Sequence, residues 1–226
     1  MTAPTVLVVG ASRGIGLELV RQYAESGARV IGTHRAPADG QRLRALGAEA
    51  VALDVLDEAA PALLQQRLAG GRLDLAILNA GLYGPRTGGL QAPSAADFGA
   101  VMRTNVLAPM RLIPVLAPAL RPGGVLAVLS SRMGSMSQMQ SAAGWLYRAS
   151  KAALNAVLKA ASLELGAQGV VCLALHPGGW VRTDMGGAGA ETDVADSVAG
   201  LRRVLAAADA SANGRFYSHD GTEISW

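Results

Sequence analysis

The sequence predicts an α/β protein with one doubly wound parallel sheet, a Rossmann fold of three αβα layers. Short apolar runs alternate with longer helical patterns along the whole chain, as expected for buried parallel strands covered by helices on both faces. A glycine-rich turn follows the first apolar run, where doubly wound sheets place ligands. Half of the 226 residues are hydrophobic, which is enough for one core without disulfides or metal. One domain over residues 1–226 is therefore expected.

The alternation fixes the order of the expected elements. Strands are predicted at 5–9, 29–33, 50–53, 73–78, 124–129, 170–176 and 215–217. Helices are predicted at 14–26, 57–68, 94–120, 145–166 and 193–208. In such sheets ligands lie outside the carboxyl ends of the strands, so the search for chemistry starts there.

Composition excludes several classes of protein. The net charge is +3, but the arginines are spread along the chain and no basic run is longer than Arg202-Arg203, so no nucleic-acid partner is expected. The apolar run 125–129 is far too short to cross a bilayer, and the N-terminus carries no signal-peptide pattern. A cytoplasmic protein without a membrane partner is expected. Cys172 lies in an apolar run and is expected to be a small buried hydrophobe.

The turn after the first strand carries three glycines in the pattern Gly10-Ala-Ser-Arg-Gly14-Ile-Gly16. Gly10 permits the tight turn, Gly14 lets backbone approach a pyrophosphate, and Gly16 lets the helix pack closely on the strand. The helix N-terminus then faces the phosphates. This position between strand and helix predicts a dinucleotide site.

The end of the second strand indicates which dinucleotide binds. NAD sites offer a carboxylate there to the ribose 2′-hydroxyl, but this chain has Thr33-His34-Arg35 and no acid. Arg35 and Arg13 are suited to a 2′-phosphate, so NADP(H) is favoured over NAD(H). The alternative is that both arginines are ordinary solvated charges.

Tyr147 and Lys151 open a long amphipathic pattern. A spacing of four residues puts them on one helical face. A nearby ammonium favours phenolate and is expected to lower the tyrosine pKa from about 10, which suits an acid or base near neutrality. A Tyr-x-x-x-Lys pair is also common on helix surfaces. Whether this pair is catalytic therefore depends on the residues that lie near it.

Three further features converge on the same sheet edge. Ser130-Ser131 ends the fifth strand, where a hydroxyl can hold a substrate carbonyl beside the phenol. Asn79-Ala80-Gly81 ends the fourth strand, where small residues let a nucleotide approach. Pro109 cannot donate a helical hydrogen bond to the carbonyl of Asn105, which leaves that carbonyl free for a water in a proton path. The alternative for Asn105 is a tolerated polar residue beside a proline kink.

With these motifs in their order and approximate spacing, including a Pro177-Gly178 turn, the chain resembles the short-chain dehydrogenase/reductase family over nearly its whole length. The C-terminal end, Asp-Gly-Thr-Glu-Ile-Ser-Trp, is similar to the small C-factor or sniffer-type carbonyl reductase branch.

The resemblance implies roles for particular residues. Tyr147 is the acid/base, Lys151 lowers its pKa and holds the nicotinamide ribose, Ser131 orients the carbonyl, and Asn105 supports a water relay. Asp54 lies by the adenine ring. The further cofactor contacts that the resemblance implies are Ser12, Ile15, His34, Val55, Ala80, Gly178, Val181 and Thr183.

Three departures from the family pattern limit how far the family's residue roles can be assigned to this chain. Val9 replaces the usual Thr before Gly10. Ser131 lies 16 residues before Tyr147, further than is usual, so the intervening Met-rich loop must bulge. The doubled Gly178-Gly179 moves Thr183 one residue further from Pro177 than usual, which leaves open whether Val181 or Thr183 reaches the nicotinamide.

The predicted reaction is hydride transfer to a ketone or aldehyde, or the reverse oxidation of an alcohol, with Tyr147 moving the proton. Substrate loops are expected at 131–144 and 177–192, where Met133, Met136, Met139 and Trp180 line a partly apolar site or, alternatively, form local core. A small carbonyl or alcohol substrate is expected. The rival is a regulatory or signalling protein that binds NADP(H) with little turnover.

An alanine stripe on the helix at 145–166 would let another helix approach. It consists of Ala149, Ala153, Ala156 and Ala160. The resemblance implies a homodimer or homotetramer, although alanine's helix propensity alone also explains the stripe.

Overall fold

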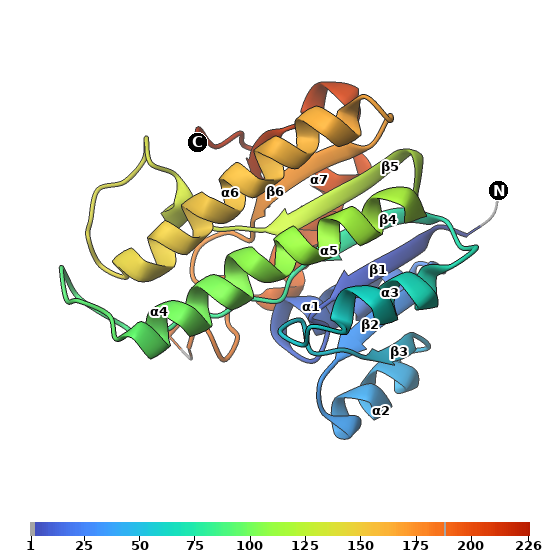
Figure 1. The fold of residues 1–226 in the computed structure, drawn as a ribbon, viewed down its shortest axis with the longest axis horizontal. Coiled ribbons are helices and arrows are strands. Elements are labelled where there is room, and N and C mark those ends of the chain that lie inside the picture. The colour runs from blue at the N-terminus through green and yellow to red at the C-terminus, as the bar shows by residue number, and fades with distance from the viewer. Residues whose placement is uncertain (1–2, 188) are drawn as a thin grey trace.

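The computed structural model describes residues 3–187 and 189–226, and its centre is one seven-stranded parallel sheet (Figure 1). The strand order is β3-β2-β1-β4-β5-β6-β7 and every neighbouring pair is parallel. The strands are β1 (Thr5–Val9), β2 (Arg29–His34), β3 (Glu49–Ala52), β4 (Leu73–Leu78), β5 (Leu120–Leu129), β6 (Val171–His176) and β7 (Arg215–Ser218). The predicted doubly wound fold is confirmed.

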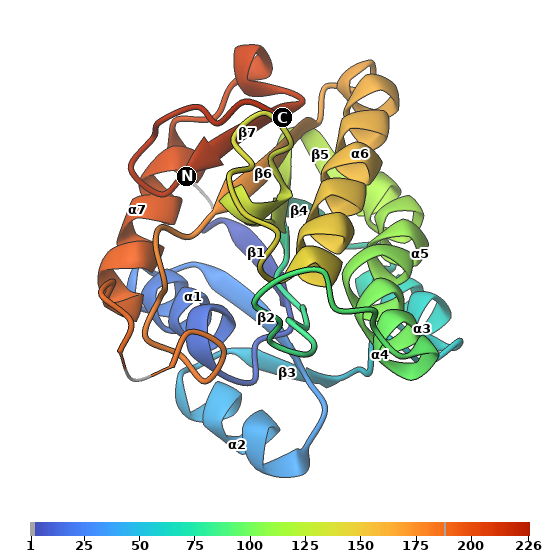
Figure 2. The same ribbon diagram turned by 90° about the vertical axis from the view of Figure 1, so that its left-hand side faces the viewer.

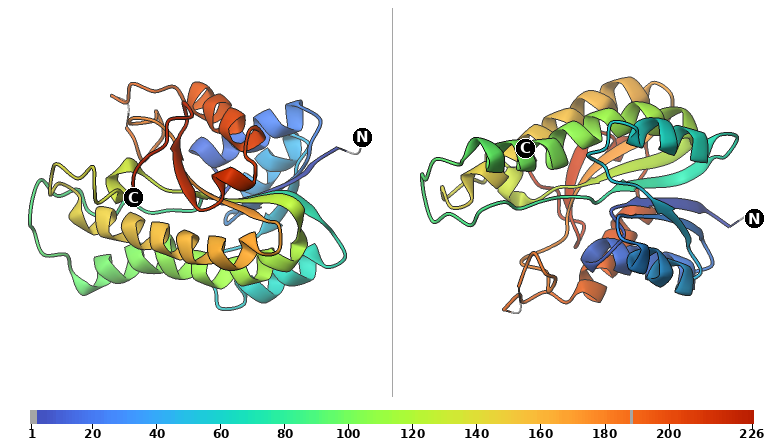
Figure 3. Two further views of the ribbon diagram at one scale, coloured as in Figure 1. Left: turned by 90° about the horizontal axis from the view of Figure 1, so that it is seen from above. Right: turned by 60° about the horizontal axis from the view of Figure 1, so that its bottom comes forward.

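Helices cover both faces of the sheet (Figure 3). One layer holds α1 (Gly14–Glu25), α2 (Pro37–Ala45) and α7 (Val194–Ala206). The other holds α3 (Ala60–Leu68), α4 (Ala95–Met102), α5 (Ala108–Leu116) and α6 (Trp145–Gly166). Four short helical turns complete the chain: η1 (Arg103–Leu107), η2 (Ala117–Ala119), η3 (Arg132–Gly134) and η4 (Ala210–Ala212).

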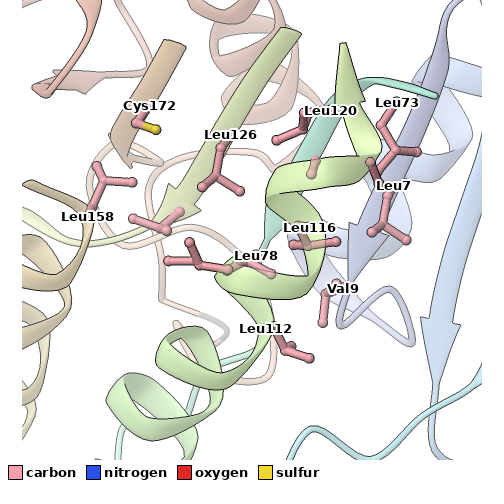
Figure 4. Close-up of a cluster of buried hydrophobic side chains, with 14 of the residues drawn as sticks. Leu7, Val9, Leu73, Leu78, Leu112, Leu116, Leu120, Leu126, Leu158 and Cys172 are labelled. Atoms are coloured by element: carbon pink, nitrogen blue, oxygen red, sulfur yellow. The ribbon is translucent and has the colours of Figure 1, made fainter. Parts of the chain in front are cut away.

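Each face of the sheet has its own apolar core. On the α5 and α6 side, Leu112, Leu116 and Leu158 pack on strand residues such as Leu7 and Leu126 (Figure 4). Cys172 belongs to this cluster and is fully buried. Strand side chains alternate between the two faces, so a sheet buried on both sides reads as the continuous apolar runs seen in the sequence.

Two elements differ from the sequence prediction. Helix α2 was not predicted between the second and third strands, because Leu43 is its one buried large apolar side chain and the segment shows little hydrophobic periodicity. The single helix predicted at 94–120 is divided into α4, the π turn η1, α5 and η2. The π turn immediately precedes Pro109, whose missing N–H interrupts regular α-helical bonding.

The predicted boundaries are otherwise close to those observed. Strand β5 begins at Leu120 rather than at 124, since Arg121, Pro122 and the following glycines extend it at an exposed end. On α6, Ala149, Ala156 and Ala160 are exposed and Ala153 is half-buried. Oligomerisation through this stripe stays a prediction. Within the described ranges, no helix combines the length and apolar character needed to cross a membrane.

Candidate active site

A cleft runs along the carboxyl ends of the strands, on the edge that Figure 2 faces. It crosses the point between β1 and β4 where the strand order reverses, which is the usual ligand crevice of doubly wound sheets. Its volume is about 360 Å³. The predicted site residues in its lining are Gly10, Ser12, Arg13, Gly14, Ile15, His34, Arg35, Asp54, Val55, Asn79, Ala80, Gly81, Tyr147, Lys151, Pro177 and Thr183.

The glycine turn is built as its sequence predicts. Gly10 and Gly14 have φ angles of +86° and +53°, a region that favours glycine. A Cβ on Gly10 would lie 2.7 Å from the backbone of Ala80, and one on Gly16 would lie 2.1 Å from the Gly10 carbonyl oxygen. Asn79 Nδ2 donates to that same oxygen at 2.6 Å. Side chains are thus excluded from the turn, and its backbone is fixed beside the cleft.

Charged side chains surround a smaller hollow at the adenine end of the predicted site. Its volume is about 350 Å³, and it is lined by Ser12, Arg13, Arg35, Asp39, Arg42 and Asp184. Arg13 Nη1 donates to Asp184 Oδ2 at 2.8 Å, and Arg42 pairs with Asp39. Arg42 and Asp39 were missed in the sequence because the helix that carries them, α2, was not predicted.

Two adenine-end residues are also held by local contacts. His34 is buried, and its Nδ1 lies 2.9 Å from the Ala36 carbonyl oxygen. Its ring packs on Gly40, where a Cβ would come within 2.6 Å of Nε2. The Asp54 carboxylate accepts the Leu56 amide at 3.0 Å. Both residues still line the cleft, as predicted.

Tyr147 and Lys151 lie at the other end of the cleft, on the first two turns of α6. The two side chains are almost completely buried, with 8% and 4% exposed. Lys151 Nζ lies 5.6 Å from the centre of the Tyr147 ring and donates to the Leu129 carbonyl oxygen at 2.7 Å. The Ser131 side chain lies close enough to the Tyr147 phenol to lower the pKa of that phenol. Three of the four predicted catalytic residues, Ser131, Tyr147 and Lys151, therefore lie close together at the end of β5.

The predicted lowering of the Tyr147 pKa is wrong for this structure. Burial raises the pKa of the phenol, the neighbouring Tyr83 raises it further, and the hydrogen bond with Ser131 lowers it only in part. Burial also lowers the pKa of Lys151 to about 8. Desolvation disfavours both charged forms, and the sequence spacing could not reveal its extent. Tyr147 is consequently a neutral, protonated phenol at neutral pH.

The two adjacent serines after β5 have different surroundings. Ser130 is buried and donates to Asn155 Oδ1 at 2.5 Å, while Asn155 Nδ2 donates to the Gly134 carbonyl oxygen at 3.2 Å. Ser131 is less buried and accepts the Met133 amide at 3.2 Å. Ser130 thus supports the turn η3 and also lines the cleft, and Ser131 is the serine that lowers the Tyr147 pKa.

Asn105 is completely buried in the π turn η1. Its Oδ1 accepts the Leu82 amide at 2.8 Å, and its Nδ2 donates to the Leu82 carbonyl oxygen at 2.8 Å and to Ser150 Oγ at 2.9 Å. The side chain therefore joins the loop after β4 to α6. A role for its backbone in a water relay stays a prediction.

The segment after β6 approaches the glycine turn. Thr183 lines the cleft, and its Cγ2 lies 3.1 Å from the position that a Cβ on Gly14 would take. Val181 is buried, with its backbone bridged to Thr192. Gly178 has φ of +105° and is covered by the His219 ring. Of these two residues Thr183 lines the cleft, and a nicotinamide contact by either stays a prediction.

The predicted substrate loops differ in how they are held. The loop between η3 and α6 is tied to the C-terminal end, since Ser135 Oγ donates to the Ser225 carbonyl oxygen at 2.5 Å and the Ser137 amide donates to that of Trp226 at 3.2 Å. Met136, Met139 and Trp180 are 71%, 44% and 47% exposed. These three residues do not form local core, which was the alternative interpretation.

Sequence reasoning missed two residues next to the phenol. The Tyr83 ring stacks on Tyr147 with 4.5 Å between the ring centres, and Arg86 lies 5.0 Å from the centre of the Tyr83 ring. Both belong to the loop that follows Asn79-Ala80-Gly81. They were missed because a loop has no periodicity from which side-chain positions can be predicted.

The cleft fits a phosphorylated dinucleotide. Its centre is a turn from which side chains are sterically excluded, at the N-terminus of α1. Guanidinium groups lie at one end and the buried phenol at the other. Residues Gly10 to Gly16 would hold the pyrophosphate, Arg13 and Arg35 a 2′-phosphate, and Tyr147 with Lys151 the nicotinamide ribose.

Comparison with protein families agrees with this arrangement. The family model described as short chain dehydrogenase matches residues 4–193. The chain is 39% identical to C-signal from Myxococcus xanthus over 158 residues, which cover 69% of this chain and 94% of that protein.

Solved structures extend the similarity to the whole chain. A carbonyl reductase from Pseudomonas aeruginosa PAO1 in complex with NADP is 36% identical, with a TM-score of 0.89 and complete coverage of both chains. The carbonyl reductase Sniffer of D. melanogaster is 27% identical, with a TM-score of 0.89 and again complete coverage of both.

Proposed function

Because this chain belongs to the short-chain dehydrogenase/reductase family, in a branch similar to C-signal and Sniffer, we propose that it is an NADPH-dependent reductase of ketones or aldehydes. The observation that carries the proposal is the protonated, buried Tyr147, which lies beside Ser131 and Lys151 at one end of a cleft whose centre is a glycine turn. The NADP-bound carbonyl reductase with the same fold supports it.

The preference for NADPH over NADH rests on the adenine end of the cleft. No carboxylate follows β2 at the position that would bind a ribose 2′-hydroxyl, and Arg35 stands there. The guanidinium groups of Arg13 and Arg35 suit a 2′-phosphate. When bound, NADPH supplies the hydride.

The chain's own residues supply the proton and orient the substrate. The Tyr147 hydroxyl donates its proton to the carbonyl oxygen as negative charge develops there. Ser131 Oγ donates a hydrogen bond to the same oxygen and positions it beside the phenol. Lys151, charged below its pKa of about 8, stabilises the phenolate that proton transfer leaves behind.

The decisive experiment is Tyr147→Phe, measured as steady-state NADPH oxidation with a panel of ketones and aldehydes. The variant keeps the ring that stacks on Tyr83 and loses only the hydroxyl. We expect kcat to fall by about 10²-fold or more, since general acid catalysis contributes that much, while NADP⁺ affinity is retained. The matched control is Tyr217→Phe on β7, which should keep full activity. A Tyr147→Phe variant of near wild-type kcat would overturn the assignment.

A second function is favoured by one comparison. The relative with 39% identity carries the name C-signal, so a regulatory protein that binds NADP(H) with little turnover is the rival. Tight, saturable NADP⁺ binding in a titration, with no NADPH oxidation on any carbonyl compound of the panel, would favour that rival.

A further inference from the structure

Three side chains from two separate loops form a cluster beside the proposed proton donor. Tyr83 and Arg86 come from the loop after β4, and Trp180 comes from the loop after β6. The Tyr83 and Trp180 ring centres are 5.8 Å apart, and Arg86 Cζ lies 5.0 Å from the first and 5.3 Å from the second. We call Tyr83, Arg86 and Trp180 the mouth cluster.

The mouth cluster is in direct contact with Tyr147. The Tyr83 ring stacks on the Tyr147 ring at 4.5 Å with an angle of 26° between the planes. The steps of 4.5 Å and 5.0 Å place the Arg86 guanidinium carbon no more than about 9.5 Å from the centre of the Tyr147 ring. A substrate of about the length of a substituted benzene ring is therefore long enough to contact both Tyr147 and Arg86.

The guanidinium of Arg86 is oriented but has no partner charge. Arg86 is an exposed residue whose Cζ lies over the rings of Tyr83 and Trp180, and its Nη2 donates to the Met185 carbonyl oxygen at 2.5 Å. Among residues 3–187 and 189–226, no carboxylate forms an ion pair with it. Arginine has five N–H donors, so most of its donor edge has no acceptor from the described part of the protein.

The surroundings favour a planar ligand with an anionic end. Trp180 is 47% exposed, and an exposed aromatic face beside a cation binds flat π systems. A fork of N–H groups pairs best with a carboxylate or another oxyanion. Because the rings fix the guanidinium beforehand, little side-chain freedom is lost on binding.

We propose that Arg86 makes this enzyme selective for carbonyl substrates that carry an oxyanion, a carboxylate above all, on a planar body. The proposal rests on the proposed reductase function. The planar body lies against the exposed Trp180 ring, Tyr147 protonates the carbonyl oxygen, and Arg86 binds the anionic end. Arg86 thereby determines specificity without taking part in proton transfer.

The test compares 4-carboxybenzaldehyde with 4-methylbenzaldehyde, two aldehydes of the same shape that differ in charge. NADPH oxidation is measured for the wild type, for Arg86→Gln, and for Arg203→Gln as a matched control on the exposed side of α7. 4-Formylphenyl phosphate replaces the carboxylate by a phosphate and shows which oxyanion is preferred. Repeating the assays at high salt checks that the preference is electrostatic.

We expect the wild type to have a higher kcat/KM on 4-carboxybenzaldehyde than on 4-methylbenzaldehyde. In Arg86→Gln the kcat/KM on the carboxylate should fall by about tenfold or more, because this is the effect of losing a hydrogen bond to a charged group. The loss on 4-methylbenzaldehyde should stay below about twofold, and Arg203→Gln should match the wild type on both. Arg86→Glu should reverse the preference, with salt reducing the difference. NADP⁺ affinity measured on each variant shows that it is folded.

Two results overturn the inference and leave the reductase function in place. One is a wild type without preference for the carboxylate or the phosphate. The other is an Arg86→Gln variant whose kcat/KM falls equally on both aldehydes. That result would mean that the mouth cluster only holds the two loops together. Absence of NADPH oxidation on any carbonyl compound would instead remove the reductase function, and this inference with it.

Discussion

Lys151 carries a charge into the interior of the protein, and the cost of doing so can be measured. Its side chain is 4% exposed, and burial lowers the pKa from 10.5 to about 8. That difference corresponds to about 3 kcal/mol of unfavourable free energy for the charged form in the folded state. Lys151→Met keeps a side chain of similar length and removes the charge.

The pH dependence follows from when each state loses its proton. Below pH 8 Lys151 is charged in both the folded and unfolded states, so the wild type bears the whole cost. Between about pH 8 and 10.5 the unfolded chain binds more protons than the folded protein, so wild-type stability rises with pH. We expect the wild type to gain about 3 kcal/mol relative to Lys151→Met across this window.

The assay is urea unfolding of both proteins at several pH values from 7 to above 10.5. Taking the difference between them cancels all groups that titrate alike in the two proteins. Lys159→Met is the matched control, because Lys159 lies on the exposed side of the same helix, and its difference from the wild type should stay flat. A flat difference for Lys151→Met as well would refute the burial argument. The same variant should lack NADPH turnover at every pH.

Two further predictions concern the ends of the cleft. Asn105→Ala removes the three hydrogen bonds that Asn105 makes to Leu82 and Ser150. This change should lower the free energy of unfolding by about 2–4 kcal/mol in urea titrations. A loss below about 1 kcal/mol would mean that the link is dispensable. Asp184→Asn frees Arg13 from an exposed ion pair that is worth at most about 1 kcal/mol. It should therefore tighten NADP⁺ binding up to about fivefold by calorimetry and leave NAD⁺ unchanged; equal effects on both nucleotides would contradict this.

The sequence was most informative where a regular pattern or a steric requirement acts on neighbouring residues. Gly10, Gly14 and Gly16 lie between a buried strand and a helix, and each of them stands where the backbone or a close contact excludes a side chain. Pro109 likewise predicted a missing helical hydrogen bond to the carbonyl of Asn105, and the π turn was found there, although the division of the helix was not predicted. The positive φ angles of Gly10 and Gly14 and the contact of Gly16 with the Gly10 carbonyl act within a few residues and can be read directly from the chain.

What the sequence could not predict depends on contacts between distant segments. Helix α2 buries little apolar surface, so its hydrophobic pattern is weak. The sequence therefore did not predict that Arg42 lines the hollow beside Arg13 and Arg35. Tyr83 and Trp180 lie in loops far apart in the chain, yet the fold brings their rings to 5.8 Å. The Tyr147 pKa follows from the same cause, because burial of the phenol raises it first and the charge interaction with Tyr83, from a distant loop, raises it further. The spacing of Tyr147 and Lys151 shows that they are neighbours, and only packing shows how deeply they are buried.

The burial of Tyr147 also bears on the direction of the proposed reaction. Reduction of a carbonyl needs a phenol that still holds its proton, whereas oxidation of an alcohol needs the phenolate. Desolvation and the stacked Tyr83 raise the pKa of Tyr147, so the protonated form predominates at neutral pH. Lys151, charged below about pH 8, opposes the build-up of negative charge only as the proton leaves. In the proposed reduction, Tyr147 therefore starts from its protonated form at neutral pH.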